Sequence, residues 1–248
     1  MKYMKKNKHK IIPALMIGRA GSTGLPGKNI MKVFGKHLFE YPLIEAKKVS
    51  RINKIFVSTD CKVIKETCRK RNYEIINRPK YLSSKEALGE DAFKHGHDKI
   101  KKKYEFDFII LLMANSPTVN SNIINKGIDI LIDNPKIDSA VSVSRYNMFS
   151  PQRARILDKN KLLKPYLNKN QISIGNCDRD SSGNFYFADM GVSIVRSSCF
   201  ENMENNVPPQ KWMGKKIAPI FSECGFDIDY HWQIPLAKYW ISNVSKKI

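Results

Sequence analysis

Apolar residues along this chain follow two patterns that alternate. Continuous apolar runs, which are typical of strands buried on both faces of a parallel sheet, lie at 11–17 and 108–113, and shorter, mainly apolar strand patterns lie at 54–57, 73–76 and 140–143. Between them, apolar positions three and four residues apart indicate helices at 41–49, 63–71, 88–103 and 123–132. Because strand and helix alternate from residue 11 to residue 144, the pattern predicts an α/β fold with a mostly parallel sheet and helices on both faces.

The alternation stops between residues 145 and 188, where prolines and a polar stretch at 176–183 interrupt it. We interpret this segment as an excursion from the sheet, an arm for a partner subunit. Strand patterns return at 192–195 and 217–221. Leu236, Tyr239 and Trp240 mark the expected inner face of a final helix. We therefore expect a basic N-terminal tail at 1–10 and a single domain at 11–248, with the arm at 145–188.

The composition is that of a globular protein, with 42% hydrophobic and 27% charged residues. No apolar run approaches the ~20 residues that a membrane span needs, so we expect no membrane partner. The five cysteines are scattered and form no Cys-x-x-Cys pair of the kind that binds zinc or performs redox chemistry. This pattern favours reduced thiols and a cytoplasmic protein.

The chain is strongly basic, with 43 basic and 23 acidic residues and a net charge of +20. Such a charge attracts nucleic acids. However, much of the excess lies in lysine runs such as 101–103, and no zinc-finger, aromatic RNA-binding or helix-turn-helix pattern accompanies it. We expect no nucleic-acid partner and interpret the charge as steering of small anionic substrates. A non-catalytic nucleic-acid-binding module on the same fold remains an alternative.

Residues 18–29 follow the first predicted strand and contain four glycines together with Arg19 and Lys28. Small residues let backbone N–H groups approach phosphate oxygens, and the two cations neutralise phosphate charge. In open α/β sheets ligands bind at this place, outside the carboxyl end of a central strand. The glycine spacing matches neither the P-loop nor the dinucleotide-binding pattern. The alternative for this loop alone is a flexible turn with incidental cations.

Asp227 and Asp229 flank Ile228. In an extended segment both carboxylates face one side while the isoleucine faces the core. Two converging carboxylates repel each other unless a cation joins them, and Mg²⁺ (or Mn²⁺), which accepts carboxylates together with phosphate oxygens and water, fits that requirement. Without further context, a solvated cap of the final helix is the competing interpretation.

Five blocks of the chain, taken together, resemble the acylneuraminate cytidylyltransferase family. The loop Arg19–Asn29 follows the family form A-R-x-G-S-K-G-x-P-x-K-N closely. The other blocks match in the same order and are Val57–Asp60, Arg78–Pro79 with Leu82–Ser83, Leu111–Leu112 with Ser116–Pro117, and Asp227–Asp229. The resemblance therefore spans nearly the whole chain.

The resemblance implies a Rossmann-like fold of the nucleotide-diphospho-sugar transferase type, a homodimer, and transfer of CMP from CTP to a sugar acid with release of pyrophosphate. It implies a catalytic set of Lys28, Arg19, Asp227 and Asp229, with the two aspartates as metal ligands. The implied nucleotide-binding residues are Arg19, Ser22, Lys28, Asn29 and Arg78. We assign substrate binding to Asn115, Ser116 and Asp189.

Three departures from the family pattern leave the sugar open. Thr23 stands where the family commonly has lysine, and Met113 stands where it has a substrate-contacting glutamine. Asp189-Met190-Gly191 replaces the usual Asn-Gly. A sialic, legionaminic, pseudaminic or Kdo-like acid would therefore be compatible with the sequence. A nucleotidyltransferase that uses another sugar or nucleotide is the remaining enzymatic alternative.

Overall fold

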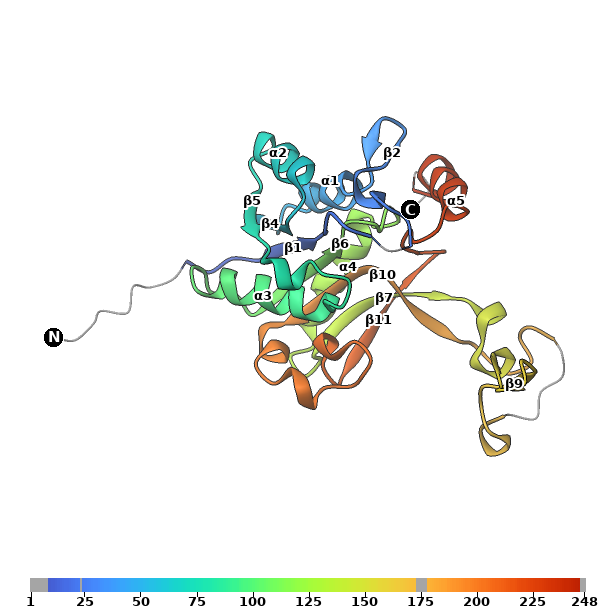
Figure 1. The fold of residues 1–248 in the computed structure, drawn as a ribbon. Coiled ribbons are helices and arrows are strands. Elements are labelled where there is room, and N and C mark those ends of the chain that lie inside the picture. Colours follow the sequence, from blue (N-terminus) through green and yellow to red (C-terminus); the bar gives the residue numbers. More distant parts are fainter. Residues whose placement is uncertain (1–8, 23, 173–177, 246–248) are drawn as a thin grey trace.

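A seven-stranded sheet forms the middle layer of the computed structural model, which describes residues 9–22, 24–172 and 178–245 (Figure 1). The strands in spatial order are β11 (Ile217–Ser222), β7 (Ser139–Arg145), β10 (Tyr186–Arg196), β6 (Phe108–Met113), β1 (Pro13–Ile17), β4 (Lys54–Thr59) and β5 (Glu74–Asn77). β10 is antiparallel to β6 and β7, and the other neighbouring strands are parallel. The predicted α/β fold with a mostly parallel sheet is confirmed.

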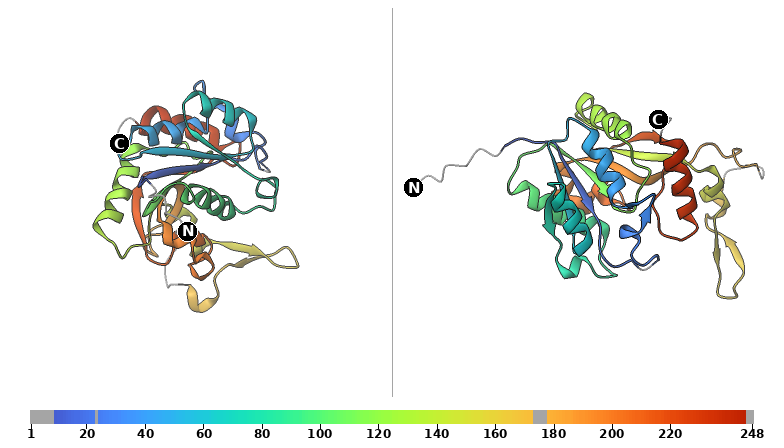
Figure 2. Two further views of the ribbon diagram at one scale, coloured as in Figure 1. Left: turned by 90° about the vertical axis from the view of Figure 1, so that its left-hand side faces the viewer. Right: turned by 90° about the horizontal axis from the view of Figure 1, so that it is seen from above.

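Helices cover both faces of this sheet (Figure 2). The helices on one face are α1 (Glu40–Lys48), α2 (Lys62–Lys70) and α4 (Ser121–Asp133), and α3 (Gly89–Lys101) lies on the other. Side chains of β1 alternate between the two layers: Ala14 and Met16 pack with the first set, whereas Leu15 and Ile17 pack with α3. Because both faces of β1 are buried, its sequence is apolar at every position.

Short 3-10 helices connect the main elements. They are Lys28–Ile30, Lys80–Leu82, Asn147–Phe149, Pro151–Arg153, Lys169–Gln171, Ser197–Phe200, Met203–Asn205 and Lys211–Met213. Phe200 and Trp212 belong to those after β10 and are buried in the same cluster as Phe93 of α3. These short segments therefore complete the layer that α3 begins.

A small hairpin and the last helix, α5 (Gln233–Tyr239), form a third apolar cluster. The hairpin consists of β2 (Lys32–Val33) and β3 (Lys36–His37). Val33 and Leu38 from this region are fully buried together with Ile228 and Ala237. This cluster attaches α5, and with it the chain that precedes α5, to the loop that follows β1.

The inner face of α5 differs from the prediction. Leu236 and Tyr239 are 47% and 65% exposed, whereas Trp240 is buried as expected. Ala237 is the fully buried residue of the helix, and Ile234 is partly buried against the third cluster. The buried face of α5 therefore contains residues 234 and 237. A π-helical turn, Trp240–Val244, follows directly. The prediction was wrong because the apolar residues of this segment lie on both sides of the helix.

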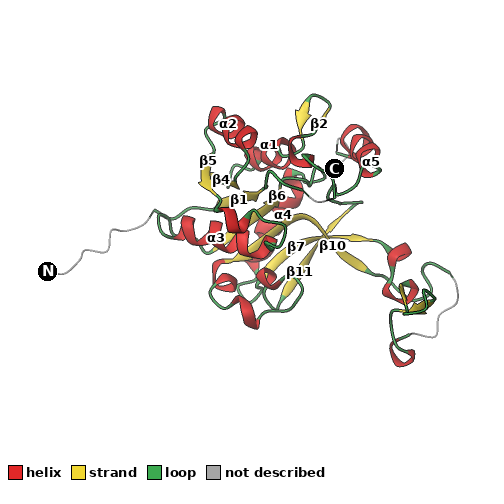
Figure 3. Ribbon diagram, in the orientation of Figure 1, coloured by secondary structure: helices red, strands yellow, loops and turns green. Residues whose placement is uncertain are grey.

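The described residues between β7 and β10, 146–172 and 178–185, leave the body of the molecule (Figure 3). They form loops, short 3-10 helices and a hairpin of β8 (Arg155–Leu157) and β9 (Leu163–Pro165). The excursion was predicted at 145–188, but Arg145 and residues 186–188 belong to β7 and β10, because these strands extend beyond their apolar runs. Its role as an arm for a partner, and the single-domain prediction for 11–248, stay predictions.

Parts of two predictions lie outside the described residues: most of the basic tail at 1–10, and residues 176 and 177 of the polar stretch. Among the described residues, Cys61, Cys68 and Cys199 are buried free thiols and Cys224 is an exposed one. The helices in the described part of the chain are all too short or too polar to cross a membrane. The expected cytoplasmic location stays a prediction.

Candidate functional site

The candidate site lies where the carboxyl ends of parallel strands meet. β1 lies between β4 and β6, and Ile17 at its end is in register with both Ser58 and Met113. A cleft of about 210 Å³ opens at this edge. It is lined by Ile17, Gly18, Arg19, Lys28, Asn29, Arg78, Leu82, Ala87, Leu88, Gly89, Met113, Asn115 and Asp227. Six of the ten predicted site residues therefore line one cleft, and each of the six lies in a segment that follows a strand.

The loop after β1 must pack closely against its neighbours to reach this position. A Cβ atom on Gly18 would lie 2.6 Å from the Cβ atom of Ala114, in the loop after β6. A Cβ atom on Gly24 would lie 2.9 Å from the backbone oxygen of Asp229. Both distances are too short for any residue with a side chain, so the two glycines allow the loop to touch both segments.

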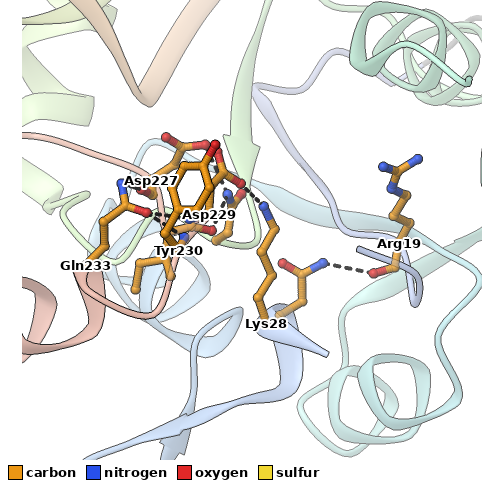
Figure 4. A network of polar contacts seen from close by, with 9 residues as sticks. Arg19, Lys28, Asp227, Asp229, Tyr230 and Gln233 are labelled. Carbon is orange, nitrogen blue, oxygen red and sulfur yellow. Dashed lines mark hydrogen bonds and ion pairs between the residues drawn. The ribbon is translucent and has the colours of Figure 1, made fainter. Parts of the chain in front are cut away.

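Lys28 and Asp229 form an ion pair across this contact (Figure 4). The Lys28 side chain is 15% exposed and the Asp229 side chain is 45% exposed. The two residues are 201 positions apart in the sequence. The hypothesis that the cation of the glycine loop and the acidic pair face one cavity is therefore consistent with the structure. Their roles in a reaction stay predictions.

Asp227 lies beside this ion pair and is more deeply buried. Its Oδ2 accepts a hydrogen bond from Nδ2 of Asn115 at 3.0 Å. Burial and the nearby Asp229 carboxylate raise the pKa of Asp227, while Lys28 and Asn115 oppose the rise. Ile228 between the two aspartates is fully buried, as the alternation predicted.

These two carboxylates fit a divalent cation. They are hard oxygen donors close to each other, and a positive ion would relieve the cost of keeping both ionised. Within the described residues, no group of three or more His, Cys, Asp or Glu side chains could hold a metal ion. The remaining ligands would therefore have to be water and phosphate oxygens, which is the usual arrangement for Mg²⁺ at a nucleotide.

Arg19 joins the loop after β1 to the loop before α3. Its guanidinium donates a hydrogen bond to the backbone oxygen of Ser84. Its own backbone oxygen accepts a hydrogen bond from Nδ2 of Asn29 at 2.9 Å. In Figure 4 the Arg19 guanidinium lies apart from the two aspartates and does not point toward them. Arg19 and Lys28 thus bring their positive charges to different parts of the cleft.

Arg78 follows β5 and forms part of the cleft wall, although it is only 8% exposed. It donates a hydrogen bond to the backbone oxygen of Ser58 at 3.0 Å. Burial lowers its pKa to about 10, while the Asp60 carboxylate opposes this and Arg19 adds to it. The guanidinium therefore remains charged at neutral pH. Its Nε atom is buried and has no hydrogen-bond partner in the described part of the chain.

Four predicted site residues are not among those that line the cleft: Asp229, which reaches it through its ion pair with Lys28, and Ser22, Ser116 and Asp189. Ser116 and Asp189 are buried, with Ser116 Oγ donating to the backbone oxygen of Met190 at 2.7 Å and Asp189 accepting from Ser144 Oγ at 2.8 Å. Ser22 lies in the glycine loop, outside the lining residues. Thr23, the departure from the family pattern, lies outside the described residues. The substrate-binding role given to Ser116 and Asp189 stays a prediction.

Gln233 is part of the site and was missed by the sequence reasoning. Figure 4 shows its amide directed at the backbone around Asp227, Asp229 and Tyr230. It is the first residue of α5. The signal that the sequence offered was a glutamine in the first turn of a helix, where such side chains reach back to backbone N–H groups.

A family model described as cytidylyltransferase matches residues 10–202. The chain is 32% identical over 136 residues to N-acylneuraminate cytidylyltransferase of Streptococcus agalactiae serotype III (strain NEM316), an alignment that covers 54% of this chain and 31% of that protein. It is 26% identical over 133 residues to 3-deoxy-manno-octulosonate cytidylyltransferase of Bdellovibrio bacteriovorus, covering 52% and 48%. The chain thus spans about a third to a half of the length of these relatives.

The fold is similar to two solved structures. CMP:2-keto-3-deoxy-manno-octonic acid synthetase complexed with CTP superposes with a TM-score of 0.67 at 14% identity, covering 95% of this chain and 99% of that one. For 4-diphosphocytidyl-2C-methyl-D-erythritol synthase from Anaerococcus prevotii the TM-score is 0.63 at 14% identity, with 94% and 97% covered. At this identity the likeness shows a shared fold.

Proposed function

The chain belongs to the cytidylyltransferase family, and from this premise we propose that it transfers CMP from CTP to a 2-keto sugar acid. The products are a CMP-sugar and pyrophosphate. The observation that carries the proposal is the meeting of Lys28 with Asp227 and Asp229 at a cleft lined by two further cations, Arg19 and Arg78. Cations suit the phosphates of a nucleotide, and the paired carboxylates suit its divalent counterion.

The reaction that fits this arrangement needs no covalent enzyme intermediate. The anomeric hydroxyl oxygen of the sugar acid attacks the α-phosphorus of CTP, and the bond from that phosphorus to the oxygen bridging to the β-phosphate breaks. Pyrophosphate leaves, and the hydroxyl proton is lost to solvent. Negative charge grows on the leaving phosphates, where Lys28 and Arg19 stabilise it. Asp227 and Asp229 would hold a Mg²⁺ or Mn²⁺ ion that neutralises phosphate charge and orients the reacting groups.

Met113 bears on the choice of sugar acid. It stands at the end of β6 and lines the cleft, in the position where the family pattern has a substrate-contacting glutamine. A thioether cannot donate a hydrogen bond and accepts one only weakly. We therefore propose that the sugar acid is a sialic, legionaminic, pseudaminic or Kdo-like acid, and that this protein does not recognise it through a hydrogen bond from residue 113.

A substrate panel tests the proposed function. We expect pyrophosphate release in the presence of Mg²⁺ when CTP is combined with one of these 2-keto sugar acids, and clearly slower release with UTP, GTP or ATP. The measurement is the initial rate of pyrophosphate release for each pair of nucleotide and sugar acid. A preference for UTP or GTP would favour a nucleotidyltransferase for another sugar or nucleotide. Tight, salt-sensitive binding of RNA or DNA with no turnover would favour the non-catalytic alternative.

We propose in addition that two copies of this chain form a homodimer through the arm. Apolar side chains on the arm are exposed in the single chain, among them Leu157 at 66% and Leu163 at 70%. A contiguous exposed apolar surface is a common mark of a contact between proteins. A second chain that covered these residues would remove them from water.

Light scattering tests the homodimer. We expect a molar mass twice that of the single chain for the unmodified protein, and the mass of a single chain for the double variant Leu157→Glu, Leu163→Glu. The matched control is Ile132→Glu, because Ile132 is 53% exposed but belongs to α4. A single-chain mass for the unmodified protein would contradict the proposal.

A further inference from the structure

We propose that Gln233 is a positioning residue that holds Asp227 and Asp229 in the arrangement that binds the divalent cation. This inference rests on the proposed function, because that function gives the two carboxylates their metal ion. Gln233 would touch neither the metal nor the nucleotide in this arrangement. It would act on them through the backbone that carries the two aspartates.

The contacts of Gln233 span the whole acidic segment. Its Oε1 accepts hydrogen bonds from the backbone N–H groups of Asp229 at 2.7 Å and Tyr230 at 2.8 Å. Its Nε2 donates to the backbone oxygen of Asp227 at 3.0 Å. A planar amide has fixed directions for its donor and acceptor. One side chain therefore ties both aspartates and the following residue to the start of α5.

Asn115 contacts the same segment through different groups. Its Nδ2 donates to Oδ2 of Asp227 at 3.0 Å and to the backbone oxygen of Ile228 at 3.1 Å. Its backbone oxygen accepts from the N–H of Ile228 at 2.9 Å. Asn115 lies in the loop after β6. Asn115 and Gln233 together hold backbone groups of every residue from Asp227 to Tyr230.

This support matters because the acidic segment belongs to no strand or helix. The ladder of hydrogen bonds that fixes a strand is missing here, and two side chains take its place. Mg²⁺ demands nearly ideal octahedral geometry, so small displacements of a ligand weaken its binding. The aspartates also repel each other, which is part of the reason that the pKa of Asp227 is raised. Without Gln233, only the contacts of Asn115 would oppose this repulsion, and the backbone at Asp229 and Tyr230 would lose its support.

The substitution Gln233→Met tests the proposal, since methionine has a similar length but makes none of the three hydrogen bonds. With CTP present, we expect the dissociation constant for Mn²⁺, measured by electron paramagnetic resonance, to rise about 10- to 100-fold, the usual effect of removing a group that supports a metal ligand. The Mg²⁺ concentration for half-maximal pyrophosphate release should rise in parallel, and excess Mg²⁺ should restore much of the rate. Binding of CTP without metal should change little.

Two further variants make the result decisive. Gln233→Glu keeps an acceptor oxygen for both N–H groups, so its Mn²⁺ dissociation constant should lie between those of the unmodified protein and Gln233→Met. Lys238→Met, at an exposed position on the same helix, should leave Mn²⁺ binding unchanged. The melting temperature of each variant reports whether it is folded.

Three outcomes overturn the proposal. The first is a folded Gln233→Met protein with the Mn²⁺ affinity and Mg²⁺ dependence of the unmodified protein. The second is a loss of melting temperature and of metal-free CTP binding in both Gln233 variants, which would assign Gln233 a purely structural role. The third is an unmodified protein that neither binds Mn²⁺ with CTP nor releases pyrophosphate, in which case the proposed function fails as well.

Discussion

Replacing Lys28 by methionine is expected to lower kcat for pyrophosphate release about 10²- to 10³-fold, the usual cost of removing one group that stabilises developing charge. Lys28 is the cation closest to the acidic pair and is mostly buried, at 15% side-chain exposure. A charge in a partly desolvated cleft acts more strongly on phosphate oxygens than a charge in water. Methionine keeps most of the volume of the lysine stem, so the loss would report on the ammonium group.

The melting temperature of Lys28→Met should change little. Asp229, its partner in the ion pair, is 45% exposed, and a carboxylate in contact with water tolerates the loss of one partner. The control is Lys36→Met, which removes an exposed lysine from the neighbouring hairpin. We expect the control to retain its rate. A Lys28→Met protein with normal kcat and a raised KM would show that Lys28 only binds the nucleotide in its ground state.

Replacing Asp227 by asparagine is expected to lower kcat/KM by more than roughly 10³-fold. The change would withdraw a metal ligand, and with it the neutralisation of several phosphate oxygens at once. Asparagine has almost the same shape as aspartate, so little else should change. The measurements are the rate of pyrophosphate release and the binding of Mn²⁺ in the presence of CTP.

The stability of the Asp227→Asn variant, unlike its kcat/KM, should stay the same or increase. Burial and Asp229 raise the pKa of Asp227, which means that the folded protein disfavours its ionised form. A carboxyl whose pKa is raised on folding costs stability at neutral pH, above its normal pKa. Asparagine removes this cost, so the metal-free variant should have an equal or higher melting temperature. The control is Asp133→Asn, an exposed site at the end of α4. An active Asp227→Asn protein would contradict the proposed metal site.

The sheet and its helices could be predicted because each element has one dominant pattern. The run 108–113 is apolar at every position and becomes β6, buried on both faces. Apolar residues at helical spacing in 63–71 correspond to α2, with Ile64 and Cys68 buried. The strand hairpins β2–β3 and β8–β9 were missed because two- and three-residue strands are too short to show a period of two.

The site was predictable to the extent that its residues occur in recognisable motifs. The glycine loop and the Asp-Ile-Asp triplet each suggested their own chemistry, and family order placed them together. Nothing in the sequence indicated that Lys28 would contact Asp229 rather than Asp227, because that choice depends on packing between distant segments. For Gln233 the sequence offered only a glutamine in the first turn of a helix, and the role proposed for it comes from its three hydrogen bonds to backbone groups.

The ion pair between Lys28 and Asp229 has a consequence for the order in which charges enter the cleft. Each partner neutralises the other, so neither Lys28 nor Asp229 presents an uncompensated charge in the absence of ligand. A polyphosphate that bound alone would pair with Lys28 and leave the Asp229 carboxylate without its partner, close to the phosphates. A divalent ion that bound alone to Asp229 would displace the Lys28 ammonium group, which would remain close to the ion and repel it. A nucleotide and its metal arriving together satisfy both charges at once. Under the proposed function, the closed pair would therefore favour the metal–nucleotide complex over either component by itself.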